Sequence, residues 1–129
     1  MTLDAIEAKY REYRSRRFPE RGMWMEGNCY PFALILRDWL SFQGISSRIV
    51  YDMIDGHFLN VFEIPMKASS EVSFTVLADW EGMHALYPGY AARLGDVFYG
   101  NGKHCLVPWP SYSETDSLHY VRIVRDCCL

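Results

Sequence analysis

The sequence predicts a single α+β domain, spanning residues 1–129, in which N-terminal helices pack on an antiparallel sheet. Apolar residues recur at helical spacing in the first third of the chain, which indicates two amphipathic helices. From residue 46 onward, short runs of β-branched and aromatic residues are separated by turn signals such as Asp55-Gly56, which is typical of antiparallel strands. Half of the 129 residues are hydrophobic, which is enough to bury one core without disulfides.

The first helix is predicted over residues 3–17. Apolar and aromatic residues recur there at helical spacing, at Leu3, Ile6, Tyr10 and Tyr13. Thr2 stands where an N-cap belongs, and the arginines between residues 11 and 17 suit the negative end of the helix dipole. We interpret this basic end as a solvated helix terminus, and a partner-binding surface is the alternative.

The second helix is predicted to begin at Cys29, after a glycine-bearing loop over residues 20–27. Asn28 stands at the N-cap position, and Pro31 is tolerated because the first turn of a helix has no intrahelical use for its missing N–H. Gly44 is predicted to end the helix as a C-terminal cap. The buried stripe of this helix consists of Phe32, Leu36, Trp39 and Leu40.

Three strands are predicted next, over residues 46–53, 57–64 and 72–79. The second and third are expected to form an antiparallel pair, joined by a polar loop. Pairing Ile64 with Val72 would place His57 directly opposite Asp79, and residues directly opposite share a face of the sheet. The same register pairs Phe62 with Phe74 and Asn60 with Val76.

The last third of the sequence gives weaker signals. Residues 80–102 are predicted to be a long, partly irregular segment with a short helix over residues 90–94. Two further strands are expected over residues 104–107 and 118–124, separated by a Pro-Trp-Pro-Ser turn or loop.

The charge and cysteine content exclude several classes of function. A formal net charge of −3 gives no overall field that would attract nucleic acid, so we expect no nucleic-acid partner. The N-terminus lacks a basic segment followed by an apolar core, and no run of apolar residues is long enough to span a membrane. The four cysteines form no C-x-x-C pair or disulfide framework, which favours free thiols and a cytoplasmic protein.

Cys29, His57 and Asp79 form the candidate catalytic set. A thiol is a useful nucleophile only as the thiolate, and the exposed N–H groups and positive dipole of a helix N-terminus lower its pKa. Cys29 is predicted to occupy that position. His57 would hold the proton or form the ion pair, and Asp79 would orient the imidazole from behind.

Three short segments resemble the Cys, His and Asp motifs of the transglutaminase-like and papain-like cysteine enzymes. They are Gly27-Asn28-Cys29, the run GHFLNVF from Gly56 to Phe62, and Ala78-Asp79-Trp80. The resemblance covers about residues 24–80. It implies a papain-like, transglutaminase-like core over the single domain, an acyl-thioester intermediate, and reaction at an amide or ester carbonyl of a protein or peptide substrate, with no metal or organic cofactor.

The resemblance also implies an oxyanion hole. Members of this superfamily use the backbone amide of the cysteine together with an upstream Gln or an aromatic N–H. No Gln precedes Cys29, so Trp24 is the second candidate donor. Losing one donor of an oxyanion hole typically costs about 2.7–4 kcal/mol of transition-state stabilisation, so the identity of this residue matters.

Four alternatives stay open. They are a catalytically inactive binding or assembly module of the same fold, a phage or effector-type interaction protein, a metal centre, and a second catalytic pair at His104-Cys105. Adjacent residues on a strand point to opposite faces, which argues against the last. None of the potential metal ligands shows the close spacing of a structural zinc site, so we expect no metal; they are Cys29, His57, His84, His104, Cys105 and His119.

Overall fold

The computed structural model describes residues 2–25, 28–65, 73–86, 95–99 and 102–109. These ranges form an α+β structure. The helices are α1 (Leu3–Arg17), α2 (Arg21–Met25) and α3 (Cys29–Phe42). The strands are β1 (Ser47–Asp52), β2 (His57–Pro65), β3 (Ser73–Ala78), β4 (Met83–Leu86), β5 (Gly95–Tyr99) and β6 (Gly102–Pro108).

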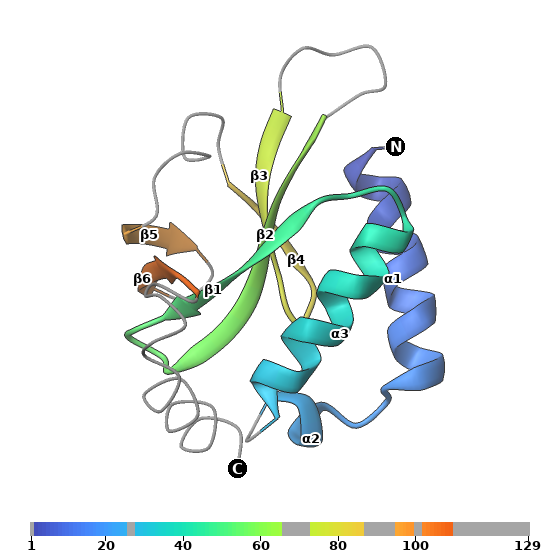
Figure 1. Ribbon diagram of the computed structural model, residues 1–129, viewed down its shortest axis with the longest axis horizontal. Helices are drawn as coiled ribbons and strands as arrows, with labels where there is room; N and C mark the ends of the chain where they lie inside the picture. The colour runs from blue at the N-terminus through green and yellow to red at the C-terminus, as the bar shows by residue number, and fades with distance from the viewer. Residues whose placement is uncertain (1, 26–27, 66–72, 87–94, 100–101, 110–129) are drawn as a thin grey trace, which may run out of the picture.

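The strands form one sheet in the order β4-β3-β2-β1-β6-β5, and all neighbouring strands are antiparallel. Figure 1 shows that the sheet is strongly twisted and that α1 and α3 lie side by side against it. Helix α3 packs directly on β1 and β2. The predicted arrangement of N-terminal helices on an antiparallel sheet is therefore confirmed.

The ends of the two long helices follow from their capping residues. The Thr2 side chain accepts a hydrogen bond from the Ala5 amide (3.4 Å), so α1 begins where the sequence predicted. Helix α3 ends at Phe42, and Gly44 beyond it adopts a φ of 85° and donates its N–H to the Ser41 carbonyl (2.9 Å). The Ile45 N–H then reaches back to the Leu40 carbonyl (2.9 Å), which completes a Schellman cap.

The main hydrophobic core lies between the helices and the sheet. It joins α1 and α3 to one face of β2 and β3, and its buried members are Ile6, Tyr10, Phe32, Leu36, Leu40, Phe62, Ile64, Val76 and Ala78. Trp39 packs against this cluster, and its ring stacks on Tyr13 of α1. The predicted apolar stripe of the second helix is therefore the face that holds α3 on the sheet.

Asn60 links α3 to the sheet through polar contacts inside this core. Its side chain is fully buried, donates a hydrogen bond to the Ala33 carbonyl (2.8 Å) and accepts one from the Ser47 hydroxyl (3.1 Å). Because a buried amide without partners is costly, these two contacts fix Asn60 as a structural residue.

The β1–β2 hairpin places His57 at the start of a strand. The predicted Asp55-Gly56 turn is present: Gly56 has a φ of 63° and donates its N–H to the Asp52 carbonyl (2.8 Å). A φ in this region favours glycine because it lacks a Cβ. His57 then pairs with Asp52 as the first residue of β2.

The predicted register between β2 and β3 was wrong by two residues. Ile64 pairs with Phe74 and Phe62 with Val76, and the last pair joins Asn60 to Ala78. A shift of two residues keeps every side chain on its predicted face, because side chains alternate with a period of two. Asp79 therefore lies beyond the last pair, and its side chain meets His57 diagonally instead of from directly opposite.

Other expectations met mixed outcomes. The segment predicted as a loop over residues 20–27 contains the short helix α2, and the segment predicted as irregular contains β4 and β5. The strand expected over residues 104–107 is present within β6. The short helix expected over residues 90–94 and the strand over residues 118–124 lie outside the described residues.

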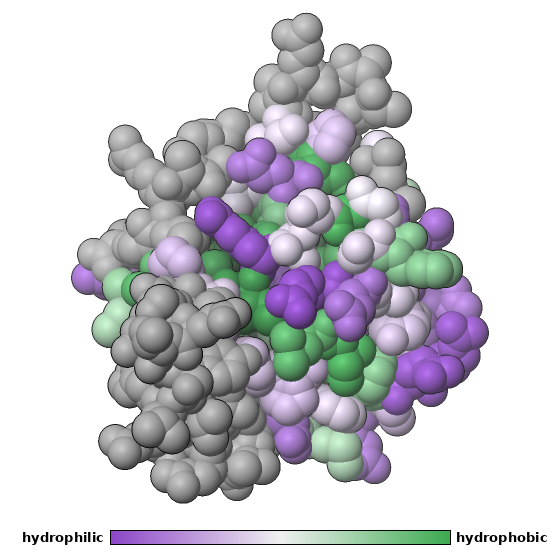
Figure 2. Space-filling model, in the orientation of Figure 1, coloured by the Kyte–Doolittle hydropathy of each residue, from purple (hydrophilic) through white to green (hydrophobic). Residues whose placement is uncertain are grey.

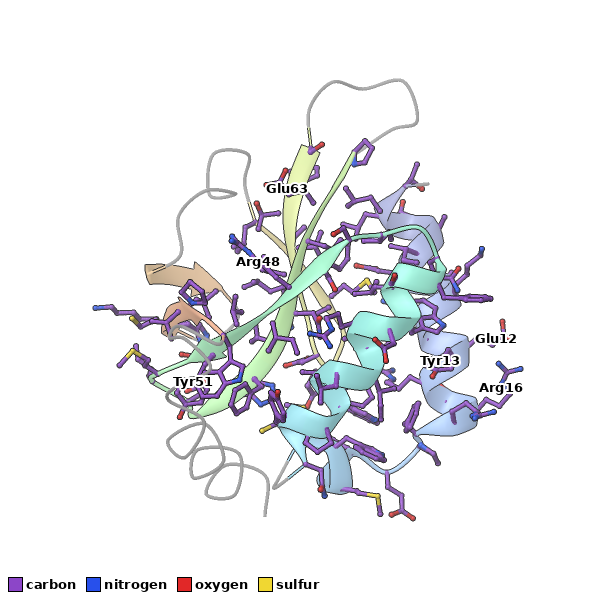
Figure 3. All side chains as sticks on the ribbon, viewed as in Figure 1. Glu12, Tyr13, Arg16, Arg48, Tyr51 and Glu63 are labelled. Atoms are coloured by element: carbon purple, nitrogen blue, oxygen red, sulfur yellow. The ribbon has the colours of Figure 1, made fainter. Side chains whose placement is uncertain are left out.

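The outer side of α1 is hydrophilic. Figure 2 shows purple residues gathered along the edge where Figure 1 draws this helix. Glu12 and Arg16 point away from the domain there (Figure 3), whereas Tyr13 belongs to the side that stacks on Trp39. None of the helices in the described residues combines the length and the apolar character needed to traverse a lipid bilayer.

Candidate active site

Three elements bring Cys29, His57 and Asp79 together. Cys29 is the first residue of α3, His57 is the first residue of β2, and Asp79 directly follows β3. The imidazole Nε2 of His57 lies 3.0 Å from Asp79 Oδ2. The same imidazole forms a side-chain hydrogen bond with Cys29, so the three residues make a connected chain.

The series of hydrogen bonds from Asp79 through His57 to Cys29 has the connectivity that activates a cysteine nucleophile. With Nε2 engaged by the carboxylate, Nδ1 is the ring nitrogen available to the thiol. The side chains of His57 and Asp79 are both 13% exposed, so their contact is largely shielded from water. Cys29 is 3% exposed, and its sulfur therefore sits in the interior at the helix N-terminus.

The electrostatics of the site favour a protonated imidazole. Burial disfavours the charged form of His57, but the hydrogen bonds to Asp79 and Cys29, together with their charges, outweigh burial and raise the pKa of His57 to about 9. At neutral pH this arrangement holds a positive charge between the carboxylate and the sulfur. Such a charge stabilises a thiolate, which is the reactive form of cysteine.

Asp79 is held by its own turn. Its Oδ1 accepts a hydrogen bond from the Gly82 N–H (3.3 Å), and its N–H donates to the Gly82 carbonyl (3.1 Å). These two bonds orient the carboxylate so that Oδ2 is directed at His57. Oδ1 of Asp79 therefore stabilises the turn, while Oδ2 contacts the imidazole of His57.

Helix α1 anchors the same turn from the other side. The Tyr10 hydroxyl donates to the Asp79 carbonyl (2.5 Å), and Arg14 Nη1 donates to the carbonyls of Trp80 and Glu81 (2.7 Å each). The Arg14 guanidinium also lies 4.7 Å from the centre of the Trp80 ring. Burial, and then the charge of Asp79, raise the pKa of Tyr10, so its hydroxyl remains a donor.

These α1 residues are the part of the site that sequence reasoning missed. Tyr10 and Arg14 are one helical turn apart, and that spacing is a signal that both face the same neighbour. The sequence placed Arg14 in a basic, solvated helix end, and for this residue the interpretation was wrong. Arg11 matches the interpretation as part of a solvated helix end, since its side chain is 72% exposed and its described ion pair is with Glu7.

We expect Arg14→Met to destabilise the protein by about 1.5–3 kcal/mol, because two charge-assisted hydrogen bonds are lost while the apolar stem is kept. Arg11→Met on the same helix is the matched control and should change stability by no more than about 0.5 kcal/mol. Urea unfolding followed by circular dichroism measures both. Equal effects of the two substitutions would contradict a specific role for Arg14.

Trp24, the second candidate oxyanion donor, is held by the packing of its ring. It lies on α2, where its ring packs at 5.2 Å, edge to face, against Phe18 and at 5.7 Å against Phe32. These contacts give Trp24 a packing role in the main core. The Cys29 amide belongs to the first turn of α3, and the first N–H groups of a helix point out of its N-terminus.

No family model, curated protein or solved structure matches this chain. Any function therefore has to be inferred from its own residues. The connected Cys29, His57 and Asp79 side chains are the strongest starting point, because they join a nucleophile, a base and an orienting carboxylate.

The other predicted site residues are dispersed. His84 lies on β4, paired with Leu77, and His119 lies outside the described residues. His104 and Cys105 do not act as a pair, since His104 is buried and directed to Asp52 whereas Cys105 is partly exposed. Trp109, which directly follows β6, is buried, and its ring centre lies 5.0 Å from that of Phe58.

Proposed function

We propose that the protein catalyses thiol-dependent acyl transfer or hydrolysis at an amide, on a papain-like, transglutaminase-like core. The observation that carries this proposal is the hydrogen-bonded series from Asp79 through His57 to a cysteine at a helix N-terminus. A cysteine, a histidine and a carboxylate in this order are the parts of a cysteine nucleophile. A protein or peptide is the proposed substrate, and the proposed location is cytoplasmic.

Each residue has a defined part in this reaction. The Cys29 sulfur attacks the carbonyl carbon, and the C–S bond forms as the carbonyl electrons move onto oxygen near the Cys29 amide. His57 gives its proton to the departing amine as the C–N bond breaks, which leaves a thioester. Water or an amine then attacks the thioester, His57 accepts its proton, and the thiolate leaves. Asp79 keeps the imidazole oriented throughout.

A second candidate function is that of a catalytically inactive binding or assembly module. Two observations favour it: Cys29 is only 3% exposed, and Trp24 is engaged in packing within the core. Both alternatives use the same fold. The ionisation of the Cys29 thiol is the property that distinguishes them. Peptidase, amidase, deamidase and transglutaminase activities share the catalytic alternative.

The test is to measure the ionisation of the Cys29 thiol directly. We expect the thiolate absorbance near 240 nm, taken as the difference between wild type and Cys29→Ser, to persist at pH 6. A free cysteine with a pKa of about 8.5 would be almost fully protonated there. This readout does not depend on access of a reagent to a buried sulfur.

Alkylation by iodoacetamide at pH 6 provides the functional counterpart. Peptide mass spectrometry separates Cys29 from Cys105, which is partly exposed and serves as the internal reference. His57→Gln is expected to slow the alkylation of Cys29 at least about tenfold while the alkylation of Cys105 stays unchanged. A Cys29 thiol that is protonated at pH 6 by absorbance would leave only the inactive-module alternative.

A further inference from the structure

A second polar cluster lies beside the β1–β2 hairpin turn. It joins Asp52 at the end of β1, Asp55 in the turn and His104 on β6. His104 Nδ1 lies 2.6 Å from Asp52 Oδ2 and 3.2 Å from Asp55 Oδ2. The donor atoms of the three residues all lie within 4.8 Å of one another, although His104 is 52 positions from Asp52 in the chain.

Two of the three side chains are rigidly placed in the interior. Asp52 is 1% exposed and His104 is 7% exposed. Asp52 Oδ1 accepts hydrogen bonds from the backbone N–H groups of Ile54 (3.1 Å) and Cys105 (3.2 Å), so its orientation is set and Oδ2 is the oxygen presented to the cluster. Metal-binding carboxylates are commonly oriented by outer hydrogen bonds of this kind.

The charges of the cluster leave room for a cation. Within the described part of the chain, the ion pairs of Asp52 and Asp55 are both with His104. The two carboxylates therefore share a single imidazole as their ionic partner. Asp55 is more than half exposed, which gives solvent access to an otherwise buried group.

We propose that Asp52, Asp55 and His104 form a binding site for a divalent transition-metal cation. Two carboxylate oxygens and one imidazole nitrogen suit Mn²⁺ or Zn²⁺, and ligands about 2.0–2.2 Å from a metal lie roughly 3 Å apart, as His104 Nδ1 and the two oxygens do. The cation would take the place of the direct contacts between Nδ1 and the two carboxylates.

The proposed cation site shares no residue with the candidate catalytic set, but it adjoins the hairpin turn that leads into His57. None of Cys29, His57 and Asp79 belongs to the ligand group found among the described residues. Asp52 pairs with His57 across the β1–β2 hairpin, and Gly56 bonds back to the Asp52 carbonyl. A cation would therefore tie β6 to the hairpin turn that leads into His57 and stabilise both.

The test uses Mn²⁺ as the probe, because its preference for oxygen and imidazole ligands keeps it from the four cysteines. Loss of the free Mn²⁺ electron paramagnetic resonance signal on titration measures binding to the full chain. We expect one saturable site in wild type and an affinity at least about tenfold weaker in Asp55→Asn, which loses a ligand at a half-exposed position.

Two controls make the result decisive. Asp38→Asn changes an exposed carboxylate on α3 and should bind Mn²⁺ as wild type does. Cys29→Ser should also leave binding unchanged, because the thiol is not a ligand of the proposed site. Absence of saturable binding in wild type, unchanged affinity in Asp55→Asn, or loss of binding in Cys29→Ser would each overturn the proposal.

Discussion

Under the proposed function, replacing Asp79 by asparagine is expected to reduce turnover by roughly 10⁴-fold, as the corresponding change does in a serine protease triad. The asparagine amide presents a different pattern of donors and acceptors to His57 Nε2, so the imidazole loses the carboxylate that orients and charges it. The measurement is the rate at which amine or ammonia is released from a panel of peptide amides. Folding should be retained, since the turn is also held by Tyr10 and Arg14.

The same substitution has a signed effect on pH dependence. Hydrogen bonding and charge from Asp79 raise the pKa of His57 to about 9 against the effect of burial. Without the carboxylate, burial counts for more and the pKa of His57 falls. The alkaline limb of the Cys29 alkylation profile, which reports loss of the imidazolium, should therefore move to lower pH.

The free energy of unfolding should also depend on pH, because the pKa of His57 differs between the folded and unfolded states. The folded-state pKa of His57, about 9, lies above its ordinary value of 6.5. The imidazolium therefore contributes stability that is fully present below pH 6.5 and is lost as the pH rises through 9. Wild type should lose more stability than Asp79→Asn between these pH values, as measured by urea unfolding.

Glu81→Gln is the matched control for Asp79→Asn. Glu81 lies in the same turn but is exposed, and its carboxylate pairs with Arg21 instead of His57. Its substitution should leave both turnover and the alkylation profile close to those of wild type. If Glu81→Gln and Asp79→Asn had similar effects, Asp79 would act through the fold of the turn and not through His57.

Local signals predicted the parts of the fold that depend on local chemistry. Thr2 and Gly44 act at helix ends through contacts within a few residues, so the limits of α1 and α3 followed from the sequence. The turn before His57 was predictable for the same reason, since Gly56 supplies a backbone conformation that other residues avoid.

Long-range features were predictable only in part. Alternation of apolar residues decides which face of a strand is buried but repeats every two residues, so it placed Asp79 on the correct face and left the β2–β3 register two residues off. The contacts of Arg14 with the turn after Asp79, and of His104 with Asp52, join distant segments. No periodicity links such pairs, and they emerge only when the sheet is assembled.

The helix that carries Cys29 depends on Leu40, and Leu40→Ala is expected to destabilise the protein by about 2–5 kcal/mol. Leu40 is fully buried in the main core, and its removal leaves a cavity between α3 and the sheet. Since small domains are stable by only about 5–15 kcal/mol, the change should be plain in a urea unfolding curve.

Phe42→Ala, two residues further along α3, is the control for that loss. Phe42 is 88% exposed, so removing a larger side chain there should change stability by about 0.5 kcal/mol or less. Leu40→Ala should also loosen the far end of α3 while its N-terminal part, held by the hydrogen bond from Asn60 to the Ala33 carbonyl, keeps Cys29 beside His57. The Cys29 thiolate absorbance should then survive in the folded variant, and its loss would mean that the whole length of α3 is needed to position the sulfur.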